Sequence, residues 1–98
     1  MELYYSPGAC SMAIHITLLE LGQDFEPIMV DLGSKQTANG DDYLQINSKG
    51  YVPALALDSG EVMTETAVIL QYMADQNPNQ HLAPDAGSMA RYQLMQWL

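Results

Sequence analysis

The sequence predicts an α/β chain in which helices cover a mixed sheet. Short apolar runs typical of strands alternate with two longer segments whose apolar residues recur at helical spacing. The first unit has the order strand, helix, strand, and the second has the order strand, strand, helix. With 48% hydrophobic and 15% charged residues, the 98-residue chain has the composition of a folded domain with one core.

The first unit spans residues 2–32. Segment 2–5 (ELYY) is short, aromatic and followed by a Ser-Pro-Gly turn, which predicts a strand. Segment 10–21 predicts a helix buried on most of its circumference and ended by Gly22. Segment 25–32 (FEPIMVDL) predicts the second strand. The helix residues expected in the core are Met12, Ala13, Ile16 and Leu19, with Ile14, Leu18 and Leu21 widening the stripe.

The second unit follows a polar stretch. Segment 41–46 predicts a helix of one or two turns capped by Asp41. Segments 52–57 and 61–64 flank a short Gly-containing loop and predict a hairpin. Segment 65–76 predicts the second long helix, because its apolar residues recur at helical spacing. Those residues are Ala67, Leu70 and Ala74 on one face, with Ile69 and Met73 beside them. This order of elements predicts a thioredoxin-like βαβ-ββα domain.

The last fifth of the chain has a different character. Residues 78–87 are linker-like, and residues 88–98 predict a new amphipathic helix capped by Ser88. The apolar side chains that this helix would leave uncovered are Leu94, Met95, Trp97 and Leu98. We therefore expect residues 1–77 to form the thioredoxin-like domain and residues 88–98 to form a helix that another domain or another chain covers, as in the front portion of a larger architecture.

Composition limits the partners and the location of the protein. Three basic and 12 acidic residues give a net charge of −9, which disfavours nucleic acid, and no apolar run approaches the roughly 20 residues that cross a bilayer. A single cysteine and the absence of a signal-like leader predict a cytoplasmic protein. His15 and His81 lack companions at ligand spacing, so no metal site is predicted. An anionic ligand would need local donors such as the scarce cations Lys35 and Lys49.

Cys10, the only cysteine, lies in the stretch YYSPGACSMAIHI. In the first turn of the predicted helix, free N–H groups and the helix dipole would stabilise a thiolate, although a buried Cys10 would serve only as a small apolar residue. The residue three positions on is Ala13, which excludes a two-cysteine exchange mechanism and leaves a site that needs an external thiol. Tyr4 and Tyr5 are candidate donors to a thiolate, but strand alternation lets only one of them face it.

Two further positions suit a peptide-like ligand. A cis Val52-Pro53 bond would leave the Val52 backbone free to pair with an extended peptide, whereas an ordinary edge-strand proline would have no functional consequence. Glu65 and Thr66 open a helix whose N-terminus suits a carboxylate, and Glu65 suits an ammonium group. The simpler interpretation of Glu65 is an acidic residue placed for the helix dipole alone.

In their order, these motifs resemble one protein family. The segments YYSPGACS, VPAL and TET, together with NGDDY--IN-KG-VPAL, are similar to the amino-terminal domain of a bacterial beta-class glutathione S-transferase. The resemblance covers the whole chain. It implies a homodimeric transferase in which a thioredoxin-like domain binds glutathione and a helical domain supplies most of the pocket for hydrophobic substrates. Bound glutathione would attack small electrophiles as its thiolate.

The resemblance also implies which residues bind glutathione. Pro53 would be a cis-proline, and the backbone of Val52 would pair with the cysteinyl part of the tripeptide. Glu65 and Thr66 would hold the γ-glutamyl end, and Lys35 would face the glycine carboxylate. The family usually has a serine where this chain has Thr66, and the hydroxyl is retained.

Around the sulfur of glutathione, the resemblance implies a group of three residues. Cys10 would lie against the sulfur, with Tyr5 and Ser11 close to it, and Cys10 could form a mixed disulfide that gives a thiol-transfer side activity. Two other functions remain open from the residues alone. One is a monothiol glutaredoxin-like oxidoreductase, and the other is a non-enzymatic binding or assembly module on the same fold.

Overall fold

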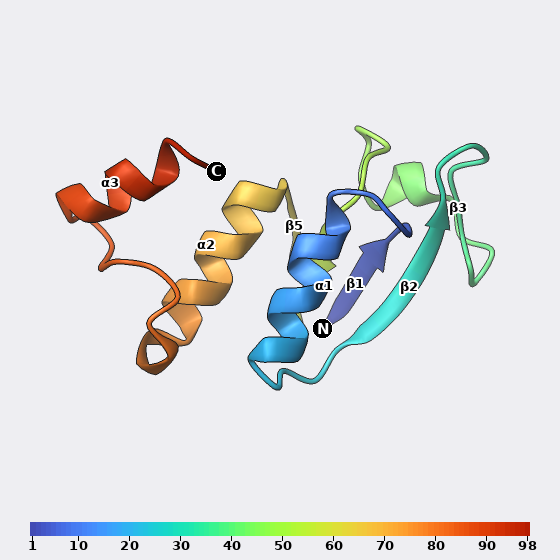
Figure 1. Ribbon diagram of the computed structural model, residues 1–98. Coiled ribbons are helices and arrows are strands. Elements are labelled where there is room, and N and C mark those ends of the chain that lie inside the picture. Colours follow the sequence, from blue (N-terminus) through green and yellow to red (C-terminus); the bar gives the residue numbers. More distant parts are fainter.

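Five strands form one mixed sheet in the computed structural model, which describes residues 1–98 (Figure 1). The order of the strands across the sheet is β3-β2-β1-β4-β5. Strand β1 pairs in parallel with β2 and antiparallel with β4, so the predicted mixed sheet is confirmed. The strands are β1 (Glu2–Tyr5), β2 (Glu26–Asp31), β3 (Gln36–Thr37), β4 (Ala54–Ala56) and β5 (Val62–Thr64).

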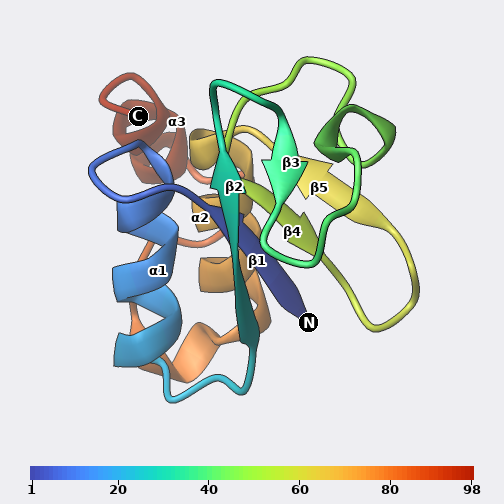
Figure 2. The same cartoon turned by 90° about the vertical axis from the view of Figure 1, so that its right-hand side faces the viewer.

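Helices α1 (Ser11–Glu20) and α2 (Thr66–Gln76) lie side by side on one face of the sheet, and α3 (Met89–Met95) lies beyond α2 (Figures 1 and 2). Between the sheet and these two helices is an apolar cluster whose fully buried members are Leu3, Ile14, Leu18, Leu55, Ile69 and Met73. On the opposite face, a second cluster gathers under the short 3-10 helix η1 (Tyr43–Gln45). Its members are Tyr4, Ile28, Val30, Tyr43 and Ala54. Successive residues Leu3 and Tyr4 therefore serve opposite cores, as strand alternation requires.

The exposed face of α1 corrects one prediction. Met12, Ile16 and Leu19, expected in the core, are 52%, 53% and 65% exposed. The buried apolar side chains are instead those of Ile14 and Leu18, which are one turn apart and face the sheet. The helix is apolar around most of its circumference, but within this chain the sheet and α2 cover only one side of it. Gly22, at φ +64, ends the helix as predicted.

Residues 36–46 are also arranged differently from the prediction. The expected helix over 41–46 is the shorter η1, and its cap is Asp42, whose carboxylate accepts a hydrogen bond from Leu44 N at 3.0 Å. Asp41 lies one residue before the cap position, in a turn where Thr37 N donates to Asp41 O and Asp41 N donates to the Thr37 hydroxyl. This turn follows β3, a two-residue strand too short to be predicted from periodicity.

The rest of the second unit has the predicted elements. Strands β4 and β5 form the expected hairpin, and α2 buries Ile69, Met73 and Ala74, whereas Ala67 and Leu70 are only partly buried. A short 3-10 helix, η2 (Pro78–Gln80), was not predicted. Ser88 caps α3 as expected, accepting a hydrogen bond from Arg91 N at 3.1 Å. None of the helices combines the length and apolar character needed to cross a bilayer.

Candidate functional site

The N-terminal ends of α1 and α2 lie at the same end of the sheet as the C-terminal end of β1 (Figure 1). The strand register explains this arrangement, because Tyr4 at the end of β1 is opposite Ala54, and Ala54 is opposite Thr64. Pro53 comes directly before Ala54, and Glu65 follows Thr64. The topology therefore gathers the first turn of α1, the loop 49–53 and the first turn of α2 along one edge, which we call the rim.

Cys10 lies at the N-cap of α1 rather than inside its first turn, a shift of one position from the prediction. Its backbone is already helical, with φ −58 and ψ −24, and its carbonyl accepts a hydrogen bond from Ala13 N at 3.3 Å. The thiol is free and exposed. Cys10 is therefore not a core residue, and a ligand at the rim would have access to it. Met12 N and Ala13 N already donate to Ala9 O and Cys10 O, so the Ser11 N–H is the free donor of the first turn, and the helix dipole also favours an anion here.

Ser11 has a different environment from its neighbour. Its side chain is fully buried, and its hydroxyl both accepts from Ser6 N at 3.1 Å and donates to Ser6 O at 3.2 Å. Ser6 is in turn buried and donates through its own hydroxyl to Val30 O. The Ser11 hydroxyl thus joins the start of α1 to the turn that carries Cys10.

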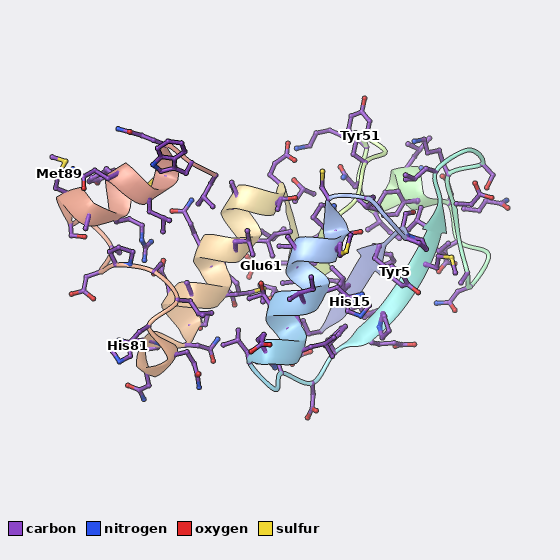
Figure 3. All side chains as sticks on the ribbon, viewed as in Figure 1. Tyr5, His15, Tyr51, Glu61, His81 and Met89 are labelled. Atoms are coloured by element: carbon purple, nitrogen blue, oxygen red, sulfur yellow. The ribbon has the colours of Figure 1, made fainter.

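Tyr4 and Tyr5 project from opposite faces of β1. Tyr5 is half-buried on the helix side, with its ring 5.3 Å from the His15 ring (Figure 3). Tyr4 is buried on the other side, with its ring 5.7 Å from Tyr43. Burial, reinforced by nearby acidic groups such as Glu2, raises the pKa of the Tyr4 hydroxyl above its ordinary value. The expectation that only one of the two tyrosines shares a face with α1 is met, and that residue is Tyr5.

The loop before β4 presents a free backbone. The Val52–Pro53 peptide bond is cis, and neither the N–H nor the C=O of Val52 makes a hydrogen bond within the chain. The carbonyl of the preceding residue, Tyr51, is tied down by the Tyr43 hydroxyl at 2.6 Å and by Asn47 Nδ2 at 2.8 Å. The loop is therefore firmly held on one side of Val52, while the Val52 amide and carbonyl stay available to a partner.

Glu65 begins α2 in a strained conformation. Its φ of +74 and ψ of 122 are unusual for a residue with a side chain, and such conformations cost about 1–3 kcal/mol. The first helical hydrogen bond runs from Ile69 N to Glu65 O, so the N–H groups of Thr66, Ala67 and Val68 precede it. The Glu65 carboxylate and these amides provide a cation site next to an anion site.

The two lysines of the chain both contact this region. Lys35 Nζ donates to Gly50 O at 3.0 Å and lies 5.8 Å from the centre of the Tyr51 ring, which projects into solvent (Figure 3). Lys49 Nζ donates to Thr64 Oγ1 and to Glu65 Oε1, both at 3.2 Å. Both lysines of this acidic chain therefore lie at or beside the rim, and Lys49 is paired there with the Glu65 carboxylate.

Comparison with known proteins identifies the family. Residues 8–76 match the family described as "Glutathione S-transferase, N-terminal domain". This chain belongs to the glutathione S-transferase family. Among its curated relatives, glutathione S-transferase GstA of Escherichia coli O157:H7 is 51% identical over all 98 residues, and GST-4.5 of Xanthomonas campestris is 39% identical over the same length. The chain spans about half the length of these relatives, 49% and 46% respectively.

Solved transferases have the same fold. A bacterial beta-class glutathione S-transferase from Sphingomonas chungbukensis superposes with a TM-score of 0.95 at 51% identity, covering 98% of this chain and 48% of that one. A sphingomonad glutathione S-transferase complexed with glutathione gives a TM-score of 0.93 at 55% identity, again over 98% of this chain and 48% of that one. The predicted thioredoxin-like fold and the resemblance to the beta class are both confirmed.

Sequence reasoning about this transferase domain missed the contacts of two residues that the structure brings to the rim. Lys49 was predicted, with Lys35, only as a donor to an anionic ligand, and its position beside Glu65 depends on the β4–β5 hairpin. Tyr51 gave no signal in the sequence, although its carbonyl anchors the loop. No three His, Cys, Asp or Glu side chains of the chain converge in a way that could hold a metal ion.

Proposed function

We propose that the rim binds reduced glutathione, and that the complete protein is a transferase that joins glutathione to small hydrophobic electrophiles. The observation that carries this proposal is the unpaired backbone of Val52 beside the cis bond to Pro53. A peptide bond of an extended ligand would satisfy both groups by strand addition. Glutathione has such a backbone at its cysteinyl residue, and the sphingomonad relative was solved with glutathione bound.

The charges of the rim match the two ends of the tripeptide. The α-carboxylate of the γ-glutamyl end would accept hydrogen bonds at the N-terminus of α2, including one from the Thr66 hydroxyl, and its ammonium would pair with Glu65. Lys35 would meet the glycine carboxylate at the other end, after exchanging its contact with Gly50. The ligand would then extend along the rim and bring its sulfur towards Cys10.

The chemistry would begin with the thiolate of glutathione, stabilised by the N-terminus of α1 and by neighbouring donors such as the Tyr5 hydroxyl. This thiolate would attack an electrophilic carbon, so that a carbon–sulfur bond forms and the leaving group departs with its electron pair. Ser11 would act through the Ser6 turn, since its hydroxyl is already engaged there. The substrate pocket, the predicted homodimer and the cytoplasmic location all belong to this proposal for the complete protein.

The exposed thiol of Cys10 supports a thiol-transfer side activity. The Cys10 thiolate would attack the glutathione sulfur of a mixed disulfide between glutathione and another thiol, forming a Cys10–glutathione disulfide and releasing the other thiol as its thiolate. A glutathione thiolate would then attack this disulfide, regenerating the Cys10 thiolate and releasing glutathione disulfide. We propose this as an auxiliary reaction that needs Cys10, whereas conjugation uses the external thiol.

The proposal also assigns parts of the chain. Residues 1–77 would be the glutathione-binding domain, residues 78–87 a linker, and residues 88–98 the beginning of a helical domain that covers their apolar side chains. The exposed Trp97, Met95 and Leu98 support this division, being 87%, 41% and 49% exposed.

Calorimetric titration with reduced glutathione tests the proposal. We expect saturable binding by the chain and by Cys10→Ser. We also expect at least about tenfold weaker binding by Glu65→Gln, because hydrogen bonds to charged groups contribute about 1.5–3 kcal/mol. The matched control is Glu61→Gln, which makes the same charge change at the other end of β5, where the carboxylate contacts only Ser59. Equal losses in both variants, or no binding by the unmodified chain, would contradict the proposal.

A further inference from the structure

The Glu65 carboxylate already has a cationic partner in the ligand-free chain. Of the three basic residues, Arg91 is paired with Asp75, Lys35 contacts a backbone carbonyl, and only Lys49 contacts the rim carboxylate. Its ammonium lies 3.2 Å from Glu65 Oε1 and 3.2 Å from Thr64 Oγ1. An alkylammonium on this carboxylate is chemically the same group as the α-ammonium of a γ-glutamyl ligand.

We propose that Lys49 is a built-in competitor for the ammonium site of the rim. Its side chain occupies the Glu65 carboxylate when no ligand is bound, and a γ-glutamyl ligand must displace it. This inference rests on the proposed function, because it concerns how glutathione reaches Glu65. Lys49 is then a specificity-determining residue, which lowers the affinity for ligands that bring their own ammonium group.

The backbone at Lys49 is fixed while its side chain is free to exchange. Lys49 N donates to Asn47 Oδ1 at 3.1 Å, and Gly50 N donates to Asn47 O at 2.9 Å, so the turn keeps the lysine close to β5. The side chains of Lys49 and Glu65 are 51% and 63% exposed. A pair this exposed is weak and screened by salt, and the displaced ammonium passes directly into water.

Lys35 provides a comparison, because the proposed function gives it a contact with the glycine carboxylate, which both test ligands carry. It carries the same charge and contacts the same loop, but its partners are the Gly50 carbonyl and the Tyr51 ring rather than a carboxylate. Replacing Lys35 by methionine therefore frees no acidic group for a ligand. Each lysine-to-methionine change takes the net charge from −9 to −10, so any general effect of charge on an anionic ligand is the same in both variants.

The test compares two ligands by calorimetric titration of the 98-residue chain, Lys49→Met, Lys49→Arg and Lys35→Met. The ligands are reduced glutathione and glutaryl-cysteinyl-glycine, the same tripeptide without its α-amino group. In Lys49→Met, we expect glutathione to bind about two- to fivefold more tightly, the range that an exposed ion pair supports. We expect no gain for the deaminated ligand, because it brings no ammonium to Glu65.

The two other variants sharpen the expected pattern. Lys49→Arg retains a cationic partner for Glu65 and should bind glutathione no more tightly than the parent chain. Lys35→Met should weaken both ligands. Competition by Lys49 would be overturned if Lys49→Met weakened glutathione or changed both ligands by the same factor, since Lys49 would then support the site. No binding of glutathione by the parent chain would instead overturn the proposed function, and this inference with it.

Discussion

Residues 1–77 and residues 78–98 are held in place by different forces. The first part packs two apolar clusters on the two faces of its sheet. In the second part, the only buried residue is Arg91, whose guanidinium contacts the Asp75 carboxylate on α2 and donates through Nε to Pro84 O at 2.9 Å. An apolar core therefore organises the first part, whereas α3 is attached mainly through one polar contact.

The exposed apolar surface of the second part also indicates that α3 is not packed into the core of the first part. A groove between α1, α2 and α3 is lined mostly by apolar side chains, among them Leu70, Leu82, Leu94 and Leu98. Trp97 is 87% exposed at the end of the chain. The rim is therefore held by the sheet and its two helices. Substitutions that destabilise α3 should leave the structure of the rim unchanged.

The largest effect is expected from the core that supports α1. Leu18→Ala should lower the free energy of unfolding by about 2–5 kcal/mol, because the side chain is fully buried against the sheet. Its neighbour Leu19 is 65% exposed, so Leu19→Ala should change stability by no more than about 0.5 kcal/mol. Denaturant unfolding measures both. Similar losses in the two variants would mean that α1 is covered on its outer side as well.

The turn that carries Cys10 should show the next largest effect. Ser11→Ala leaves the N–H and C=O of buried Ser6 without the hydroxyl that pairs with them, which should cost about 1–3 kcal/mol in urea unfolding. Thr17→Ala is the control, since the Thr17 hydroxyl bonds to Ala13 O on the exposed part of α1. If Ser11→Ala kept full stability and lost only glutathione binding, the hydroxyl would be a ligand contact instead.

Elements of the fold were predictable where neighbouring residues in the sequence determine them, and not where contacts between distant segments do. Strand β1, helix α2 and the β4–β5 hairpin followed from local periodicity and turn residues. The buried side of α1 did not, because the helix is apolar nearly all round and only its tertiary neighbours decide which side is covered. Likewise, Asp41 and Asp42 are both good cap residues by type, and the sequence does not show that the helix starts at Tyr43, which makes Asp42 the cap.

For the candidate site, the sequence named residues but not their contacts. The family resemblance grouped Cys10, Val52, Pro53 and Glu65 around one ligand, and the sheet topology brings them to one edge. Three-dimensional contacts were beyond such reasoning, because they join positions distant in sequence. The pairing of Lys49 with Glu65 spans 16 residues, and it forms only when the hairpin returns the chain to the rim.

In the second part of the chain, the cap of α3 should matter locally. The Ser88 hydroxyl accepts from Arg91 N and donates to Asp85 O, so Ser88→Ala should weaken α3 by about 1 kcal/mol. Amide hydrogen exchange should be faster over residues 89–95 and unchanged in β1. Ser34, a serine of the first part between β2 and β3, caps no helix, so Ser34→Ala should alter neither region. Equal acceleration in β1 would mean that α3 and the sheet unfold as one unit.

The smallest effect on overall stability is expected from pH, and it should be confined to α3. The Arg91 guanidinium, through its hydrogen bonds, holds the pKa of the Asp75 carboxyl below its ordinary value. A carboxyl whose pKa is lowered in the folded state stabilises that state above the unfolded pKa, about 3.9, and this contribution is lost as pH falls from there through the folded pKa. Hydrogen exchange over residues 89–95 should therefore accelerate relative to β1 below about pH 4.

Two variants test this acceleration at low pH, which we call the acid step. In Asp75→Asn, we expect the acid step to disappear and α3 to exchange faster already at neutral pH. Asp58→Asn, which removes a carboxylate paired with the N-terminal ammonium, should keep the step. If the step survived in Asp75→Asn, a different carboxyl would control α3, and the two parts of the chain would not be joined as the Arg91 contact indicates.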